Sequence, residues 1–135
     1  MNANSNRAIV ERFLQAARER DLATMRALSA DDIRVIEADS LPYGGEHVGL
    51  DAFLELSRQV FRQLGITELR IERIIPDEDL VVVLATIRGT PPGMAPFEMP
   101  ITEIWQVQDG RIREIRPFYM DTHLVVALVQ PHARA

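Results

Sequence analysis

The sequence predicts an α+β fold in which N-terminal helices pack on a curved antiparallel sheet. Apolar residues recur at helical spacing in the first part of the chain, whereas the second half alternates between apolar and polar residues, as half-buried strands do. Asp109-Gly110 is a strong hairpin turn between two such alternating segments. With 135 residues, 47% of them hydrophobic, the chain is expected to form a single domain over residues 1–135.

The helices come first in the predicted order. Asn4 and Ser5 are capping candidates for a first helix, whose apolar positions are Ile9, Val10, Phe13, Leu14 and Ala17. A shorter helix is expected after Asp21. Residues 51–64 predict a third helix with one apolar stripe that includes Phe53, and Gly65 is expected to end it.

The strands follow these helices, with one short strand placed among them. Expected strands cover residues 33–37, 46–48, 66–75, 80–88, 97–108 and 111–119. The turn-rich segment 39–45 follows the first strand, and the Gly- and Pro-rich segment 89–96 could cover the mouth of a pocket. Asp121 is an N-cap candidate for a closing segment.

Composition excludes several classes of function. A net charge of −5 without a basic cluster argues against a nucleic-acid surface. The absence of cysteine and of lysine removes thiol, iron–sulfur and Schiff-base chemistry. We expect no cofactor and no metal site. No apolar run is long enough to span a bilayer and the start of the chain is polar, so a cytoplasmic protein without membrane contact is expected.

Glu103 is the most informative single residue. In a strand, alternate side chains share a face, which places Glu103 beside Ile101, Trp105 and Val107. A carboxylate among apolar neighbours loses water, so its pKa should rise, as in a proton-transfer catalyst. The alternative is that this strand turns its other face to the core, so that Glu103 lies in solvent or in a dimer interface.

Glu37 repeats this pattern, because it has the parity of Ile33 and Val35 at the end of the first strand. Asp39 keeps the same parity and is the fallback base, although its loop position also fits a turn or capping role.

Several stretches together resemble the nuclear transport factor 2-like superfamily, in particular its ketosteroid isomerase-like and SnoaL-like branches. These stretches are 30–35, 45–53, 104–112 and 119–121. The resemblance covers nearly the whole chain. It implies a cone of bent antiparallel sheet closed by helices, with one internal apolar pocket and commonly a homodimer through the outer sheet face. The fold alone does not select one activity.

The resemblance also implies roles for three residues. The general-base carboxylate of the isomerase pattern corresponds to Glu37, its protonated second acid to Glu103, and its aromatic residue near the end of the last strand to Tyr119. Ketosteroid isomerase is a standard example of such an acid pair. The oxyanion-hole tyrosine of the first helix corresponds to Phe13, so steroid isomerisation itself is not expected. In the SnoaL-like cyclase pattern, Glu103, Asp121 and His123 compete for the role of acid.

The remaining candidates are expected to contact a ligand. They are Phe13, Tyr43, His47, Phe53, Trp105 and Asp121. Tyr43 and His47 flank a glycine pair that could bend the chain over the pocket rim, and Trp105 suits a pocket wall. Each also has a structural alternative: a surface tyrosine, an exposed histidine, or a helix cap at Asp121.

The sequence therefore predicts a cofactor-independent acid/base enzyme acting on a small apolar carbonyl compound, of the isomerase, cyclase or dehydratase type. The main alternative is a non-catalytic small-molecule-binding or dimeric interaction module. Hydrolysis of an epoxide is a third possibility, but no arginine has a clearly inward position to complete such a site.

Overall fold

The N-terminal helices begin at side-chain caps. In the computed structural model, which describes residues 2–133, α1 (Ala3–Glu19) starts where the Asn2 side chain accepts a hydrogen bond from Ser5 N at 2.9 Å. The expected caps, Asn4 and Ser5, lie inside the first turn. α2 (Leu22–Ala27) is capped by Asp21, which accepts from Thr24 N. These caps satisfy amide groups that have no partner within the helix.

α3 (Leu50–Leu64) lies between two glycines with positive φ, Gly49 at 94° and Gly65 at 58°. A Cβ on Gly65 would lie 1.9 Å from the main-chain oxygen of Thr90. This helix therefore has to end at a glycine, as the sequence predicted.

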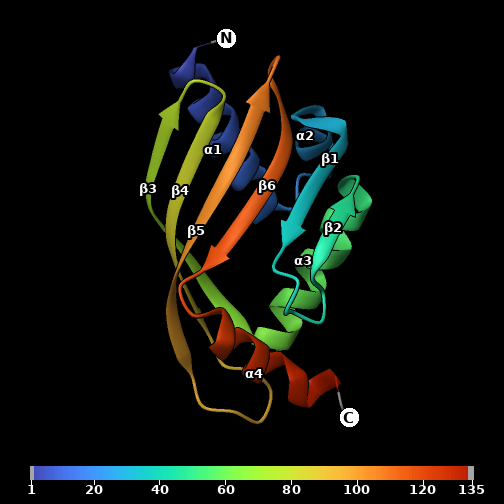
Figure 1. The fold of residues 1–135 in the computed structure, drawn as a ribbon. Helices are drawn as coiled ribbons and strands as arrows, with labels where there is room; N and C mark the ends of the chain where they lie inside the picture. Colours follow the sequence, from blue (N-terminus) through green and yellow to red (C-terminus); the bar gives the residue numbers. More distant parts are fainter. Residues whose placement is uncertain (1, 134–135) are drawn as a thin grey trace.

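One mixed sheet holds all six strands. They are β1 (Ser29–Glu37), β2 (Gly45–Val48), β3 (Ile66–Asp77), β4 (Leu80–Gly89), β5 (Phe97–Gln108) and β6 (Arg111–Tyr119). Their order across the sheet is β2-β1-β6-β5-β4-β3. All neighbours are antiparallel except β1 and β6, which are parallel (Figure 1).

β1 is longer than expected, because it begins at Ser29 and not at residue 33. Ser29 and Ala30 are buried and Ser29 pairs with Ile112, but the exposed Asp31 and Asp32 conceal the alternation. β3 likewise continues through Pro76 to Asp77.

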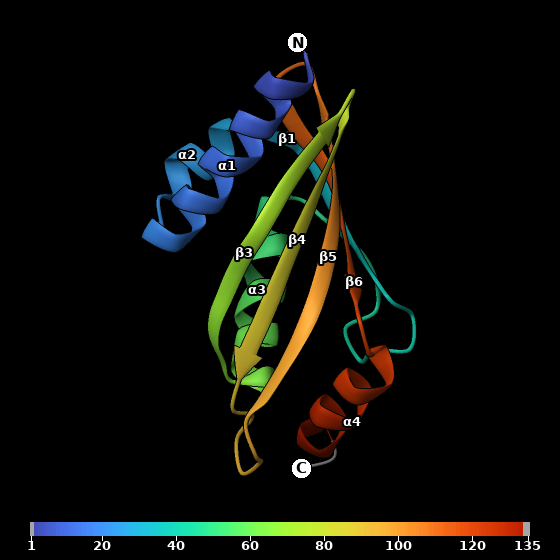
Figure 2. The same ribbon diagram turned by 90° about the vertical axis from the view of Figure 1, so that its left-hand side faces the viewer.

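The helices α1, α2 and α3 lie on one side of the bent sheet (Figure 2). Irregular register in β3–β4 and β5–β6 interrupts the ladders, and such bulges increase local twist and bending. α4 (Thr122–Ala133) follows β6, with Leu124 N donating to the Asp121 carboxylate at 3.0 Å, so Asp121 is a helix cap. The α+β fold with helices packed on a curved sheet is confirmed.

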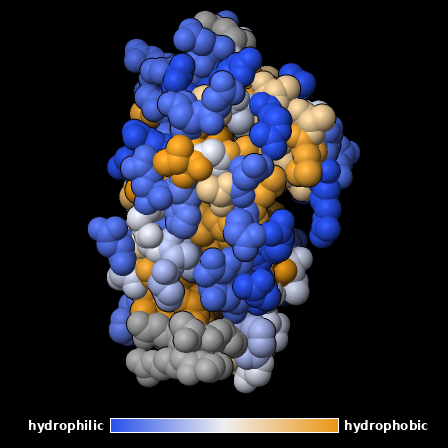
Figure 3. All heavy atoms as spheres, turned by 90° about the vertical axis from the view of Figure 1, so that its right-hand side faces the viewer, coloured by the Kyte–Doolittle hydropathy of each residue, from blue (hydrophilic) through white to orange (hydrophobic). Residues whose placement is uncertain are grey.

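The hydrophobic core fills the space between the inner sheet face and the helices. Phe13, Ile33, Leu64, Val83 and Val107 are among its almost fully buried members. On the side where α2, β2 and α3 lie in Figure 1, hydrophobic residues gather in an exposed patch that hydrophilic residues border (Figure 3). None of the described helices is both long and apolar enough to cross a bilayer.

Candidate active site

A small cavity of about 100 Å³ lies between the inner sheet face and α3. Its polar lining consists of two carboxyls, one phenol and one hydroxyl, contributed by Glu37, Glu103, Tyr119 and Ser57. The other lining residues are Val35, Phe53, Leu56, Val60, Phe61, Ile66, Leu69, Ile87, Ile101, Ile115 and Pro117. No lining residue is basic, so nothing in the wall compensates the charge of an ionised carboxyl.

Strand register brings the two acids to one transverse row. Glu103 pairs with Pro117 on β6, and the β1–β6 ladder runs as far as Val35 and Ile115. Two residues further along these parallel strands are Glu37 and Pro117. The backbones of the two acids are therefore two strand spacings apart, roughly 10 Å, with Pro117 between them. Both carboxyls line the same cavity.

Glu37 is buried with only 5% of its surface exposed, and its Oε1 has no hydrogen-bond partner. Burial raises the pKa of Glu37 from 4.5 to about 8, and repulsion from Glu103 adds to this rise. The expectation that Glu37 faces an apolar interior is thus met.

Glu103 lies on the inner face that its alternation predicted, opposite Val83 on β4. Burial raises the pKa of Glu103, while a hydrogen bond from Trp105 works in the opposite direction. In that bond Trp105 Nε1 donates to Glu103 Oε1 at 3.1 Å. One carboxyl oxygen is therefore fixed by the protein and the other remains available.

Tyr119 ends β6 and lines the cavity on the same face as Glu103, because its partner Ile101 is two residues from Glu103 along β5. Diagonal neighbours of this kind lie roughly 7–8 Å apart in a sheet. The Tyr119 hydroxyl is 3.1 Å from the Tyr43 hydroxyl. Burial raises the pKa of both phenols, that of Tyr43 to about 12.

The aromatic candidates form two layers. Phe53 lines the cavity as expected. Phe13 and Trp105 lie behind the lining: they are 1% and 2% exposed, and Phe13 packs edge-on against both Trp105 and Phe53. Phe13 and Trp105 are not among the residues that line the cavity, because their rings fill the core behind its wall.

Tyr43 and His47 are also not at the pocket rim. Tyr43 is 4% exposed, and His47 Nε2 donates to the Tyr43 carbonyl oxygen at 2.8 Å, which ties the β1–β2 loop to β2. Asp39, Asp121 and His123 are exposed. These three residues do not take part in the cavity, so Glu37 and Glu103 are its only acids among the residues described.

Sequence reasoning missed Ser57, Phe61 and Pro117 as lining residues. Ser57 and Phe61 lie on α3 near the predicted apolar stripe, and Ser57 carries the one side-chain hydroxyl of α3. Pro117 has the parity of Ile115 and Tyr119, which was the available signal.

A second, larger hollow of about 950 Å³ lies elsewhere, at the start of α1 and the β3–β4 and β5–β6 turns. It is open and its lining is mainly polar and acidic, including Asp77, Glu78, Asp79 and Asp109. Its size reflects open surface, so the smaller cavity with shifted carboxyls is the better candidate site. Among the described side chains, those of residues 2–129, no three His, Asp or Glu come together as metal ligands.

The bent sheet with helices on one side and an acid pair inside defines a protein of the nuclear transport factor 2-like class. A family model described as the SnoaL-like domain matches residues 10–115. The chain belongs to this SnoaL-like family. None of the functionally curated proteins matches the sequence.

Solved structures show the same fold. A nuclear transport factor 2-like protein of unknown function from Burkholderia pseudomallei is 27% identical, with a TM-score of 0.77 over 93% of this chain and 97% of the other. A protein from Jannaschia named as a candidate SnoaL-like polyketide cyclase is 20% identical, with a TM-score of 0.76 over 94% and 93%. TerC, crystallised with polyporic acid, is 20% identical, with a TM-score of 0.79 over 93% and 98%.

Proposed function

We propose that this chain is a cofactor-independent enzyme that moves a proton on a small apolar carbonyl compound, in a reaction of the isomerase, cyclase or dehydratase type. The observation that carries this proposal is the pairing of two carboxyls with raised pKa values in one apolar cavity without a basic residue in its wall. Acids and bases that act near neutral pH need pKa values shifted in this direction.

Glu37 is suited to the role of base. Its Oε1 is buried without a partner, and a pKa of about 8 gives the ionised form much greater basicity than an ordinary carboxylate has. Glu37 would take a proton from the carbon next to the carbonyl group of the substrate. It would then return this proton to another atom of the same molecule as the product forms.

We assign Glu103 the role of neutral acid, because burial raises its pKa and a second charge beside an ionised Glu37 is unfavourable. The hydrogen bond from Trp105 occupies Oε1, so a proton on Oε2 can point at the carbonyl oxygen of the substrate. Together with the Tyr119 hydroxyl, it would stabilise the oxyanion that forms when Glu37 removes the proton.

The comparisons support this chemistry only through what is stated of structural neighbours. One structural neighbour is named as a candidate polyketide cyclase, and another was crystallised with polyporic acid. The main alternative is a module that binds a small apolar molecule without turnover. The epoxide-hydrolase alternative is disfavoured because no arginine lines the cavity.

Exchange of carbon-bound hydrogen in D₂O tests the proposal without knowledge of the natural substrate. Cyclopentanone is a small neutral ketone whose α-protons can be followed by ¹H NMR. The wild-type protein should accelerate their exchange, and Glu37→Gln should lower the rate by about 10²-fold or more. Glu19→Gln, a change at an exposed position of α1, should leave it unaltered. Binding of the ketone without exchange would support the non-catalytic module instead.

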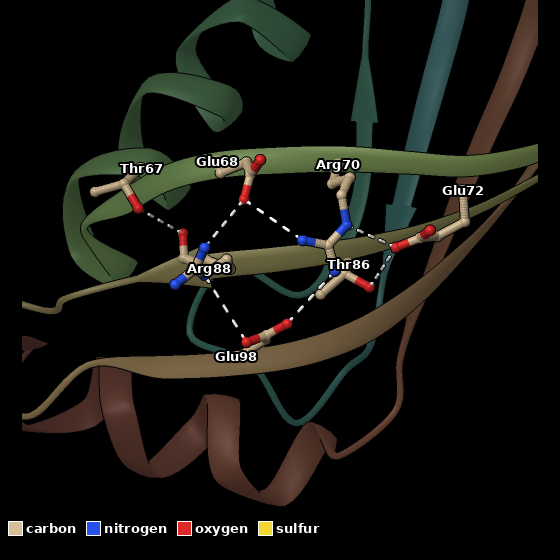
Figure 4. Close-up of polar contacts among 7 residues, drawn as sticks. All are labelled: Thr67, Glu68, Arg70, Glu72, Thr86, Arg88 and Glu98. Carbon is tan, nitrogen blue, oxygen red and sulfur yellow. Dashed lines mark hydrogen bonds and ion pairs between the residues drawn. The ribbon is translucent and has the colours of Figure 1, made fainter.

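We also propose that the protein forms a homodimer through the outer sheet face. Partly exposed apolar side chains lie at its centre: Val82, Leu84, Ile104 and Phe118. At one end Arg70 and Arg88 form ion pairs with Glu68, Glu72 and Glu98 (Figure 4). A face that carries both charges around an apolar centre can match a second copy of itself.

The oligomeric state tests the dimer. Phe118→Glu should convert a dimer to a monomer in sedimentation velocity experiments. Leu22→Glu is the matched control, because Leu22 is 49% exposed on α2 and Phe118 is 48% exposed on β6. A wild-type protein that sediments as a monomer at tens of micromolar would contradict this proposal.

A further inference from the structure

Tyr43 contacts Tyr119 but does not line the cavity. Their hydroxyl oxygens are 3.1 Å apart, and the two phenols are 4% and 9% exposed. Only Tyr119 belongs to the cavity wall. Tyr43 therefore lies one layer behind the residue that faces a ligand.

The surroundings of the two hydroxyls favour one direction of this hydrogen bond, because only Tyr119 lines the cavity. Among the side chains of residues 2–129, each hydroxyl has only the other as a hydrogen-bond partner. If Tyr119 donated, the Tyr43 proton would be buried without an acceptor, which is unfavourable. If Tyr43 donates, the Tyr119 proton is free to turn into the cavity, where a ligand oxygen can accept it.

The loop that carries Tyr43 is held in place on both sides. Leu41 N donates to Ala38 O at 3.0 Å, and Gly44 N donates to Leu41 O at 2.9 Å. A Cβ at Gly44 would lie 2.4 Å from Ala38 O, so only glycine allows this close approach. With the hydrogen bond from His47 to the Tyr43 carbonyl, these contacts fix the Tyr43 phenol behind Tyr119.

We propose that Tyr43 is a positioning residue that donates its hydroxyl proton to Tyr119 and thereby directs the Tyr119 proton at the ligand. This inference rests on the proposed function for its catalytic consequence, but the Tyr43–Tyr119 coupling itself does not. In the unliganded protein, the Tyr119 hydroxyl is then a donor free to face the cavity, and Glu37 Oε1 is an acceptor without a partner. A carbonyl compound with an acidic C–H bond complements both.

A double-mutant cycle on cyclopentanone exchange tests the catalytic consequence. Tyr43→Phe should lower the exchange rate at saturating ketone by about 3- to 10-fold, the range that one neutral hydrogen bond supports, with little change in KM. Tyr119→Phe should lower the rate at least as much. Because Tyr43 acts through Tyr119, adding Tyr43→Phe to Tyr119→Phe should cause no further loss.

A spectroscopic readout tests the coupling without any activity. The chain contains two tyrosines, so a protein labelled with ¹³C at tyrosine Cζ gives one signal from each. Tyr43→Phe should shift the Tyr119 signal, whereas Pro42→Ala, a change at an exposed position of the same loop, should not. Full additivity of the two mutations, or an unshifted Tyr119 signal in a folded Tyr43→Phe variant, would overturn the inference. Absence of exchange in the wild-type protein, together with a shifted Tyr119 signal, would refute the proposed function and retain the coupling.

Discussion

Replacing Glu37 by glutamine should stabilise the protein increasingly as the pH rises. Glu37 is 5% exposed and its pKa is raised from 4.5 to about 8, mainly by burial. Below pH 4.5 both the folded and the unfolded states hold the proton, so this residue causes no pH-dependent loss. Between pH 4.5 and 8 the unfolded chain releases the proton more readily than the folded protein, and the free energy of unfolding falls as pH rises.

The size of the effect follows from the shift. Each pKa unit corresponds to about 1.4 kcal/mol, so the loss approaches roughly 5 kcal/mol above pH 8, and roughly 4 kcal/mol of it falls between pH 5 and pH 9. This is an upper estimate, because local opening of the cavity would admit water to the carboxylate. Glutamine keeps the shape of the side chain and cannot titrate, so Glu37→Gln should avoid this loss.

Urea denaturation at pH 5, 7 and 9 measures the difference. The free energy of unfolding of Glu37→Gln minus that of the wild type should grow by several kcal/mol from pH 5 to pH 9, and Glu19→Gln should show no comparable trend. A difference that stays constant with pH would show that the Glu37 carboxyl titrates normally. The electrostatic basis of the proposed function would then be lost.

Three further predictions concern packing and hydrogen bonding. Gly65→Ala should destabilise the protein by more than the roughly 1–2 kcal/mol that positive φ alone costs, because its Cβ would meet a main-chain oxygen at 1.9 Å. Gly93→Ala is the control, since Gly93 also has positive φ but lies in open space, and it should cost only that amount. Thermal or urea unfolding measures both. Trp105→Phe should raise the pKa of Glu103 further, since it removes the donor to the carboxylate, and ¹³C NMR titration of the carboxyl measures this. Phe13→Ala should cost about 3–5 kcal/mol in urea unfolding, and a loss below 1 kcal/mol would contradict its place in the core.

Strand periodicity located the two acids correctly because side-chain parity is set within each strand. Glu103 follows Ile101 and Glu37 follows Val35, and in both cases the neighbours decide which face is buried. The alternation of side chains within each strand could not predict that the two acids lie in the same row across the sheet. That placement depends on the parallel pairing of β1 with β6, which joins segments about 80 residues apart in the chain.

The loop residues were harder to place. Tyr43 belongs to a turn whose course depends on hydrogen bonds from Leu41 and Gly44 and on the close approach at Gly44, and none of these follows a repeating pattern. The same holds for the first helix cap, where four polar residues compete near the N-terminus and the structure selects Asn2. Local polar chemistry indicated that a cap or turn was present, but not which residue made it.

The acid pair is difficult to explain as packing alone. An apolar side chain at position 37 would remove the unmatched Oε1 and the repulsion from Glu103, and mutational experience shows that such replacements in protein interiors are often neutral or stabilising. A module that only holds an apolar molecule would need one oriented polar group, and Glu103 with its Trp105 partner already supplies it. Glu37 lowers stability at neutral pH without contributing a hydrogen bond to the unliganded fold. The proposed proton abstraction would give that cost a function, and the pH dependence of stability and the exchange of ketone protons should then both depend on this one side chain.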